Sequence, residues 1–200
     1  MQEVIIVKTG CANLASIIAA LTRVGATPIA SEDPRQIAQA KYLVLPGVGT
    51  FGAAMTFWQN KSLCDPIREY VQQDKPLLAI CLGLQLLCES SEETPGVEGL
   101  AVVQKPIARF ASHMRVPQMG WNYVCAQKDH RFLESGYYYF ANSYYLEAPP
   151  TGSVPAMTYY GNDFVSAFES GNSLACQFHP ELSGKLGLKV LENWLRRTSC

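Results

Sequence analysis

A cysteine at the end of an apolar run is the first residue that could do chemistry. Cys81 follows "PLLAI" at residues 76–80 and precedes "LGLQLLCES", so it lies where a predicted strand meets a predicted helix. This is the setting of a nucleophile elbow, in which small residues two before and two after the nucleophile let strand and helix pass closely. Ala79 and Gly83 occupy these positions. The start of the helix would favour a thiolate and leave backbone N–H groups free for an oxyanion. Taken alone, a buried cysteine that packs like alanine explains the motif better.

A cysteine nucleophile needs a base, and the sequence contains three histidines. His179 ends an apolar run that reads as a strand, and Glu181 follows two residues later, on the same face of an extended chain. A carboxylate that holds one imidazole nitrogen leaves the other free to act as a base. His113 and His130 lie in loop-like stretches without a carboxylate at this spacing. His179 is therefore the predicted partner of Cys81, although a lone histidine at a strand end is more often structural.

A glycine-rich stretch, "LPGVGTFG" at residues 45–52, has the glycine spacing of a dinucleotide-binding fingerprint. It follows the third predicted strand instead of the first, and Pro46 stiffens its entry. The acid at the expected distance, Glu69, lies inside a helical pattern, so we reject a dinucleotide site. The remaining alternatives are an ordinary connection and a loop whose N–H groups face a developing oxyanion. Because this loop and Cys81 follow neighbouring strands, both would lie at the C-terminal edge of a parallel sheet.

The elements that must position these residues change in kind along the chain. Apolar runs predict strands at residues 3–7, 27–31, 42–46 and 76–80, and helical patterns lie at 13–25, 33–40, 50–60, 65–73 and 82–90. After about Glu92, segments rich in aromatic and β-branched residues predict antiparallel strands at 137–147, 154–160, 164–171 and 173–179, before an amphipathic helix at 184–197. The order predicts one α/β domain over residues 1–200. We expect a three-layer sandwich whose mixed, mostly parallel sheet has helices on both faces and an antiparallel extension.

Composition excludes several classes of function. The 200 residues are 48% hydrophobic and 16% charged, with a net charge of −1, which is typical of a globular chain. The longest basic cluster is Arg196–Arg197, so neither a nucleic-acid groove nor a membrane surface is expected. The start of the chain does not read as a signal peptide, and no apolar run has bilayer length, so we expect a cytoplasmic location. The seven cysteines are scattered and lack metal-ligand spacing, which predicts reduced thiols, no metal and no cofactor.

Three motifs together resemble a known family. "PGVGTFG", "ICLGLQLL" and "QFHPELSG", in this order and at these separations, resemble the class-I, triad-type glutamine amidotransferases. Two further stretches, "TGCANLASI" and "VPQMGWN", are similar to the glutaminase subunits of imidazole glycerol phosphate synthases, and the resemblance covers essentially the whole chain.

The resemblance implies a role for each candidate residue. It implies that Cys81, His179 and Glu181 form a triad that hydrolyses glutamine to glutamate and ammonia. It also implies two further sets: oxyanion-stabilising residues Gly47, Val48, Gly49 and Leu82, and substrate-binding residues Gln85, Ser143 and Tyr144.

A glutaminase is useful only if its ammonia reaches an acceptor, and the sequence suggests no acceptor site of its own. The resemblance implies a (βα)8-barrel cyclase subunit as heterodimer partner. That partner uses the ammonia to make imidazole glycerol phosphate and aminoimidazole carboxamide ribotide in histidine biosynthesis. The predicted docking face comprises "TGCAN" and "VPQMGWN", with Asn13, Gln118, Trp121 and Asn122.

The chain departs from the family pattern at a few positions, which leaves alternatives open. Lys8 stands where an acid is common, Gln118 and Asn142 stand where histidine is expected, and Ala79 replaces the usual glycine of the elbow. A paralogous glutaminase of another pathway, such as surface-sugar biosynthesis, or a non-catalytic binding subunit of the same fold therefore stays open. A cysteine hydrolase of another substrate fits the elbow but does not explain "VPQMGWN".

Overall fold

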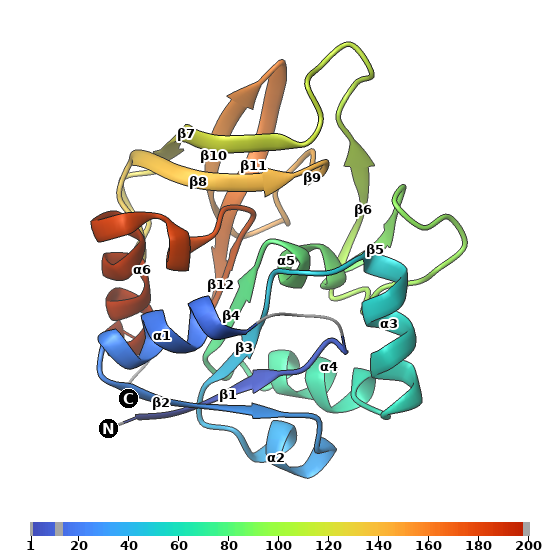
Figure 1. Ribbon diagram of the computed structural model, residues 1–200, viewed down its shortest axis with the longest axis vertical. Helices are drawn as coiled ribbons and strands as arrows, with labels where there is room; N and C mark the ends of the chain where they lie inside the picture. The colour runs from blue at the N-terminus through green and yellow to red at the C-terminus, as the bar shows by residue number, and fades with distance from the viewer. Residues whose placement is uncertain (1, 11–13, 198–200) are drawn as a thin grey trace.

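The computed structural model describes residues 2–10 and 14–197 (Figure 1). The helices are α1 (Ala15–Arg23), α2 (Pro34–Gln39), α3 (Phe51–Asn60), α4 (Cys64–Gln72), α5 (Leu82–Leu86), the 3₁₀ helix η1 (Pro180–Leu182) and α6 (Gly184–Arg197). The strands are β1 (Gln2–Val7), β2 (Ala26–Ser31), β3 (Leu43–Leu45), β4 (Leu77–Ile80), β5 (Cys88–Ser91), β6 (Val103–Arg109), β7 (Gln118–Ala126), β8 (Gly136–Asn142), β9 (Tyr144–Leu146), β10 (Val154–Tyr160), β11 (Asn162–Ser170) and β12 (Ser173–Cys176). None of the helices in the described ranges is long and apolar enough to cross a bilayer.

One mixed sheet organises the molecule. Its strands run in the order β2-β1-β3-β4-β12-β11-β10-β7-β8, and β5, β6 and β9 form a side arm that joins through β11. Neighbouring strands from β2 to β12 are parallel, whereas β12/β11, β11/β10, β10/β7 and β7/β8 are antiparallel. The sheet therefore changes from parallel to antiparallel immediately beyond β12, beside the strand that carries Cys81 at its end. The predicted mixed α/β fold is confirmed.

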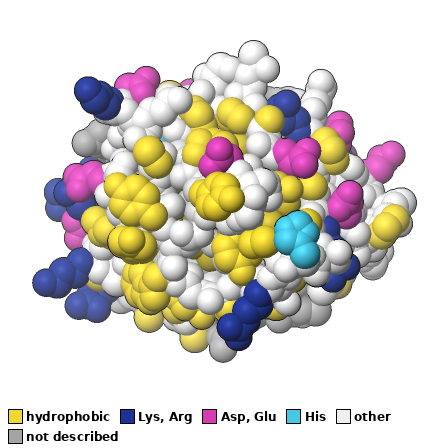
Figure 2. Space-filling model, turned by 90° about the horizontal axis from the view of Figure 1, so that it is seen from above, with side chains coloured by type: hydrophobic (Ala, Val, Ile, Leu, Met, Phe, Trp, Pro, Cys, Tyr) yellow, Lys and Arg dark blue, Asp and Glu magenta, His cyan; other side chains and the backbone are white. Residues whose placement is uncertain are grey.

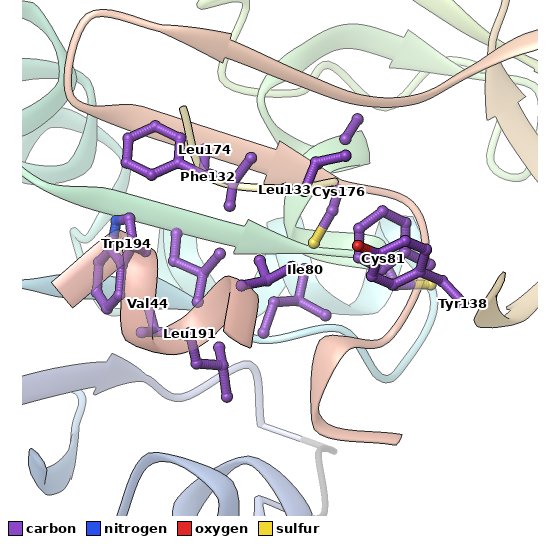
Figure 3. Close-up of a cluster of buried hydrophobic side chains, with 14 of the residues drawn as sticks. Val44, Ile80, Cys81, Phe132, Leu133, Tyr138, Leu174, Cys176, Leu191 and Trp194 are labelled. Atoms are coloured by element: carbon purple, nitrogen blue, oxygen red, sulfur yellow. The ribbon is translucent and has the colours of Figure 1, made fainter. Parts of the chain in front are cut away.

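Helices cover both faces of the parallel half because its strands are apolar on both sides. Val4 and Ile6 of β1 pack with α1 and α6, whereas Ile5 and Val7 pack with the cluster that includes α2, α3 and α4. In Figure 1, α1 and α6 lie on one side of the sheet and α3 and α4 on the other. Continuous apolar strands are what burial on both faces requires. In Figure 3, Trp194 of α6 lies near the start of β4, whereas Cys81 and Tyr138 lie near its end.

The predicted helix at 82–90 is only half right. Helix α5 ends at Leu86, and Cys88 begins strand β5, so Cys88 does not share a helix with Cys81. The Leu86 carbonyl accepts a hydrogen bond from the Leu100 N–H, and the Leu87 carbonyl accepts one from the Val103 N–H. Pairing with these distant residues competes with the helix that local periodicity favours, and it ends the helix early.

Two other predictions change in detail. Residues 118–122 of "VPQMGWN", which we expected as a docking loop, begin the long strand β7. The single strand expected at 137–147 is two strands, β8 and β9, separated by Ser143. Strand β6 was not predicted. By contrast, α2 begins as expected: Asp33 accepts a hydrogen bond from the Arg35 N–H at 2.8 Å.

Candidate active site

The turn between β4 and α5 holds Cys81 in a constrained conformation. Its φ is 46° and its ψ is −101°. Residues other than glycine rarely adopt a positive φ. Gly83 makes the turn possible, since a Cβ there would stand 2.3 Å from the Leu45 carbonyl oxygen of β3. Ala79, by contrast, packs fully buried in the apolar cluster on the α3 side of the sheet. The glycine two residues after Cys81 is thus a steric necessity, and Ala79 fits without glycine.

Cys81, His179 and Glu181 come together at the junction of the two halves of the sheet. His179 Nδ1 lies 2.9 Å from Glu181 Oε1, and both side chains are more than nine-tenths buried. The His179 imidazole lines the same pocket as Cys81, and the two side chains interact electrostatically. Strand β8 holds the main chain of His179 in two ways. The His179 N–H donates directly to the Tyr139 carbonyl. The Ser183 hydroxyl donates to the His179 carbonyl and accepts from the Tyr139 N–H.

The electrostatics of His179 reflect this environment. Burial lowers the pKa of His179, because it penalises the imidazolium, but the interactions with Cys81 and with Glu181 raise it and outweigh burial. The net pKa of His179 is raised to about 10. A protonated imidazole beside a thiolate is the form of the pair that can attack a carbonyl and then deliver a proton.

The other candidate thiols and imidazoles lack these surroundings. Cys88 is fully buried, and burial, followed by the charge of Glu89, raises the pKa of its thiol to about 12. His130 is also buried, and desolvation lowers its pKa to about 4, so it is neutral at pH 7. His113 lies exposed in the segment between β6 and β7.

A pocket of about 220 Å³ opens onto Cys81. It brings together residues from distant segments, including every predicted oxyanion and substrate-binding residue. Its lining comprises Gly47, Val48, Gly49, Cys81, Leu82, Gln85, Glu93, Ala141, Asn142, Ser143, Tyr144 and His179. The glycine loop lies directly against the elbow, since a Cβ on Gly47 would stand 3.0 Å from the Cβ of Cys81. Glu181 is outside this lining and reaches the pocket only through His179.

Glu93 is a pocket residue that the sequence did not reveal. Its carboxylate lines the cavity and accepts a hydrogen bond from the Phe51 N–H, at the start of α3, at 2.6 Å. Glu93 follows the segment 82–90, which reads as one helix, so no sequence pattern brings Glu93 back over Cys81. Because the chain turns at Leu87 and the helix ends there, Glu93 comes back to the pocket that Cys81 lines.

A chain of amide groups leads to the Cys81 sulfur. Gln85 donates to the Tyr144 carbonyl and to Gln177 Oε1, both at 3.1 Å, and Gln177 Nε2 donates to Cys81 Sγ at 3.4 Å. Gln177 is fully buried and was not predicted as a site residue. An amide inside an apolar strand carries no pattern that would distinguish it from a satisfied core residue.

The predicted interface residues are placed differently from one another. Trp121 is 57% exposed, whereas Gln118 is buried on the inner face of β7, opposite Asn142 of β8. Asn122 donates to the Tyr159 carbonyl at 3.0 Å. Asn13 lies outside the described residues. Exposed apolar side chains that the sequence did not single out accompany Trp121: Met119, Tyr123, Tyr137 and Tyr159.

Comparison with known proteins gives a family match over nearly the whole chain. Residues 9–198 match the family model for glutamine amidotransferase class-I. The chain is 42% identical over 193 residues to the "Imidazole glycerol phosphate synthase subunit HisH" of Methanothermobacter thermautotrophicus, covering 95% of this chain and 96% of that protein. It is 40% identical over 199 residues to the protein of the same name from Salmonella typhimurium, covering 97% and 99% of the two chains.

Solved structures agree on the fold. A crystal structure of a glutamine amidotransferase aligns with a TM-score of 0.79 at 19% identity, covering 98% of this chain and 99% of that one. The structure of PurLQS from Thermotoga maritima aligns with a TM-score of 0.75 at 16% identity, covering 98% of each chain. With a family match over almost the whole length and relatives near 40% identity, the chain belongs to the class-I glutamine amidotransferase family.

Proposed function

We propose that this chain is the glutaminase subunit of an imidazole glycerol phosphate synthase. In this proposal it hydrolyses glutamine to glutamate and ammonia through Cys81, His179 and Glu181. The observation that carries the proposal is the strained elbow cysteine in a small pocket that is also lined by a buried histidine, which Glu181 holds. The near-full-length similarity to proteins named as HisH subunits supports the choice of synthase.

The first half of the reaction forms a thioester. The Cys81 thiolate attacks the side-chain carbonyl carbon of glutamine, and negative charge develops on the carbonyl oxygen. N–H groups of Leu82 and of the Gly47–Gly49 loop are the proposed donors to that oxygen. The His179 imidazolium gives its proton to the amide nitrogen, the C–N bond breaks, and ammonia leaves a γ-glutamyl thioester on Cys81.

The second half releases glutamate. His179, now neutral, takes a proton from a water molecule, which attacks the thioester carbon. The C–S bond breaks, glutamate forms, and the Cys81 thiolate and the His179 imidazolium are restored. Glu181 stabilises the imidazolium and fixes the ring through Nδ1, so that the other ring nitrogen faces the reacting groups.

The pocket lining suits an amino-acid substrate. Its volume of about 220 Å³ is smaller than the roughly 300–1,000 Å³ of sites for drug-sized ligands. We assign Glu93 to the α-ammonium group of glutamine, because it supplies the carboxylate of the lining. Gln85, Ser143 and Tyr144 provide the remaining polar groups for the substrate, as the family resemblance implies.

Ammonia must be passed on, because in neutral water it is mostly protonated and no longer nucleophilic. We therefore propose a cyclase partner of the (βα)8-barrel type, docked on the outer face of β7, β8 and β10. The exposed fractions of Met119, Tyr137 and Tyr159 there are 72%, 60% and 67%. Figure 2 shows the end of the molecule that carries these strands. Apolar side chains gather in the middle of this view, and most Lys and Arg side chains lie nearer its edges. Exposed apolar patches of this kind mark protein interfaces.

Replacement of the nucleophile tests the proposed chemistry. Cys81→Ala is expected to reduce glutamate release by about a thousandfold or more, because the covalent step is lost. The measurement is glutamate release from glutamine by the purified chain mixed with its cyclase and the cyclase's ribotide substrate.

Cys88→Ala is the matched control, since it removes a buried thiol that no step uses. It is expected to keep the wild-type rate. Retained glutamate release in Cys81→Ala, together with an intact fold, would disprove the proposed function. Acceleration of the wild-type chain by the cyclase is expected, and equal rates with and without it would contradict the assigned partner.

A further inference from the structure

We propose that Gln177 is a positioning residue for the nucleophile: its side-chain amide donates to the Cys81 thiolate and holds the sulfur toward the pocket. The inference rests on the proposed function, in which Cys81 is the nucleophile. Gln177 itself does not line the pocket, so it acts through Cys81 and not on glutamine.

The main chain aims Gln177 at the site. Its N–H donates to the Ser166 carbonyl of β11 at 2.8 Å, which continues the strand pairing beyond β12. In extended backbone, residues two apart share a face, so Gln177 and His179 extend toward the same side. Two polar side chains from one strand end therefore approach Cys81, one with an imidazole and one with an amide.

The hydrogen bonds determine which end of the Gln177 amide faces the sulfur. Gln85 Nε2 contacts the Tyr144 carbonyl, which can only accept, so the NH₂ group of Gln85 must face that side. The same NH₂ group contacts Gln177 at 3.1 Å and therefore requires an acceptor, Oε1, at that position. The NH₂ group of Gln177 is then left for Cys81 Sγ, at 3.4 Å.

A donor fixed in this way acts on the thiolate more than on the thiol. An N–H group stabilises an anion that accepts from it, and the effect is strong where water is excluded. Gln177 is fully buried and Cys81 is only 6% exposed, so solvent cannot replace the amide. The amide thereby complements His179, which stabilises the same sulfur by charge.

Alkylation of Cys81 as a function of pH tests the inference without any glutaminase assay. Gln177→Glu keeps the shape and the bond from Gln85 but presents an oxygen to the sulfur, and Gln177→Met removes both polar atoms. At pH 7, iodoacetamide is expected to modify Cys81 about three- to tenfold more slowly in Gln177→Met, and more slowly still in Gln177→Glu. Mass spectrometry of the peptide that contains Cys81 gives the rate, and the midpoint of the rate–pH curve is expected to move to higher pH in both variants.

Two controls separate this role from a structural one. Asn193→Leu removes a partly buried amide of α6 that donates to the Phe132 carbonyl, and it is expected to leave the alkylation curve unchanged. Circular dichroism establishes which variants are folded, and if one Gln177 variant is unfolded the other decides. A wild-type curve in a folded Gln177 variant, or an equal shift in Asn193→Leu, would overturn the inference. If the curve shifts as expected but the wild-type chain releases no glutamate, the proposed function fails and the Gln177 assignment stands.

Discussion

Cys81 and Cys88 are both buried thiols, yet their surroundings give them opposite chemistry. The Cys88 sulfur lies 3.7 Å from the Leu84 carbonyl, which can only accept, and burial raises the pKa of Cys88 to about 12. The Cys81 sulfur instead accepts a hydrogen bond from the amide of Gln177 and lies in the pocket that the imidazole of His179 also lines. Burial alone therefore does not distinguish a packing cysteine from a nucleophile, whereas the polarity of the neighbouring groups does.

The charge on Cys81 should be visible in the titration of its partner. Cys81→Ala is expected to move the pKa of His179 from about 10 to a lower value, since the thiolate is removed while burial, which lowers the pKa, remains. In the wild-type chain the pKa of His179 is raised from 6.5, so the folded state binds the proton of His179 more tightly than the unfolded state does. This stabilisation is fully present below pH 6.5 and is lost as the pH rises to about 10.

Two measurements check this titration. Proton–carbon NMR of the histidine rings gives the midpoint for His179. Urea unfolding below pH 6.5 and near pH 10 gives the matching change in the free energy of unfolding. An unchanged midpoint in Cys81→Ala would show that the thiolate is not the source of the raised pKa.

The candidate triad could be found from the sequence because each member has a local signature. Cys81 follows a strand and precedes a glycine two residues on, and Glu181 follows His179 at the spacing of one strand face. Glu93 and Gln177 have no such signature, because their positions depend on contacts with segments far away in the chain. Residues that act through long-range contacts are therefore the ones that sequence patterns miss.

At the scale of elements, the connection between β4 and α5 depends on how closely it passes β3. The Leu45 carbonyl lies so near Gly83 that a side chain there would force β3 and α5 apart. The same movement would displace the loop from Gly47 to Gly49, which begins shortly after Leu45 and packs on Cys81.

Gly83→Ala is expected to lower the free energy of unfolding by about 1–3 kcal/mol, because the added methyl group overpacks this contact. It is also expected to slow alkylation of Cys81. Urea unfolding and the alkylation rate measure the two effects.

Gly96→Ala is the comparison for this variant. Its added methyl group meets no atom within 4 Å, so it carries only the cost of a left-handed backbone, about 1 kcal/mol. It is expected to leave alkylation of Cys81 unchanged. Equal alkylation rates in the two variants would contradict a steric role for Gly83.

Element types were predictable wherever local periodicity and tertiary pairing agree. The strands and helices of the first half and the terminal helix α6 are of this kind. The prediction failed at residues 87–90 and in the side arm, where pairing with residues 98–107 decides the structure. Aromatic alternation in "VPQMGWNY" was a usable signal for β7, since Met119, Trp121 and Tyr123 are all exposed on one face.

For the molecule as a whole, the parallel half supplies the proposed nucleophile and the antiparallel half supplies the proposed docking face. Trp121 packs edge-on against Tyr139, with ring centroids 6.2 Å apart, and the main chain of Tyr139 is bonded to that of His179. The proposed docking face and His179 thus contact the same short piece of β8.

Trp121→Ala is expected to weaken binding of the cyclase by about 2 kcal/mol, roughly thirtyfold, because large aromatic side chains dominate the affinity of such interfaces. Isothermal titration calorimetry with the purified cyclase measures the change. Ile29→Ala, at an exposed apolar residue of edge strand β2, is the matched control and is expected to bind as the wild type does. Equal losses in the two variants would place the partner elsewhere.

The position of β12 in the sheet has a consequence for biosynthesis. This strand is among the last elements in sequence order, yet it lies between β4 and β11. Gln177, just after β12, meets Cys81 across 96 residues of chain. During translation Cys81 leaves the ribosome long before His179 does, so under the proposed function a nascent or truncated chain is expected not to hydrolyse glutamine. The proposed triad forms only when this late, non-local pairing closes the centre of the sheet.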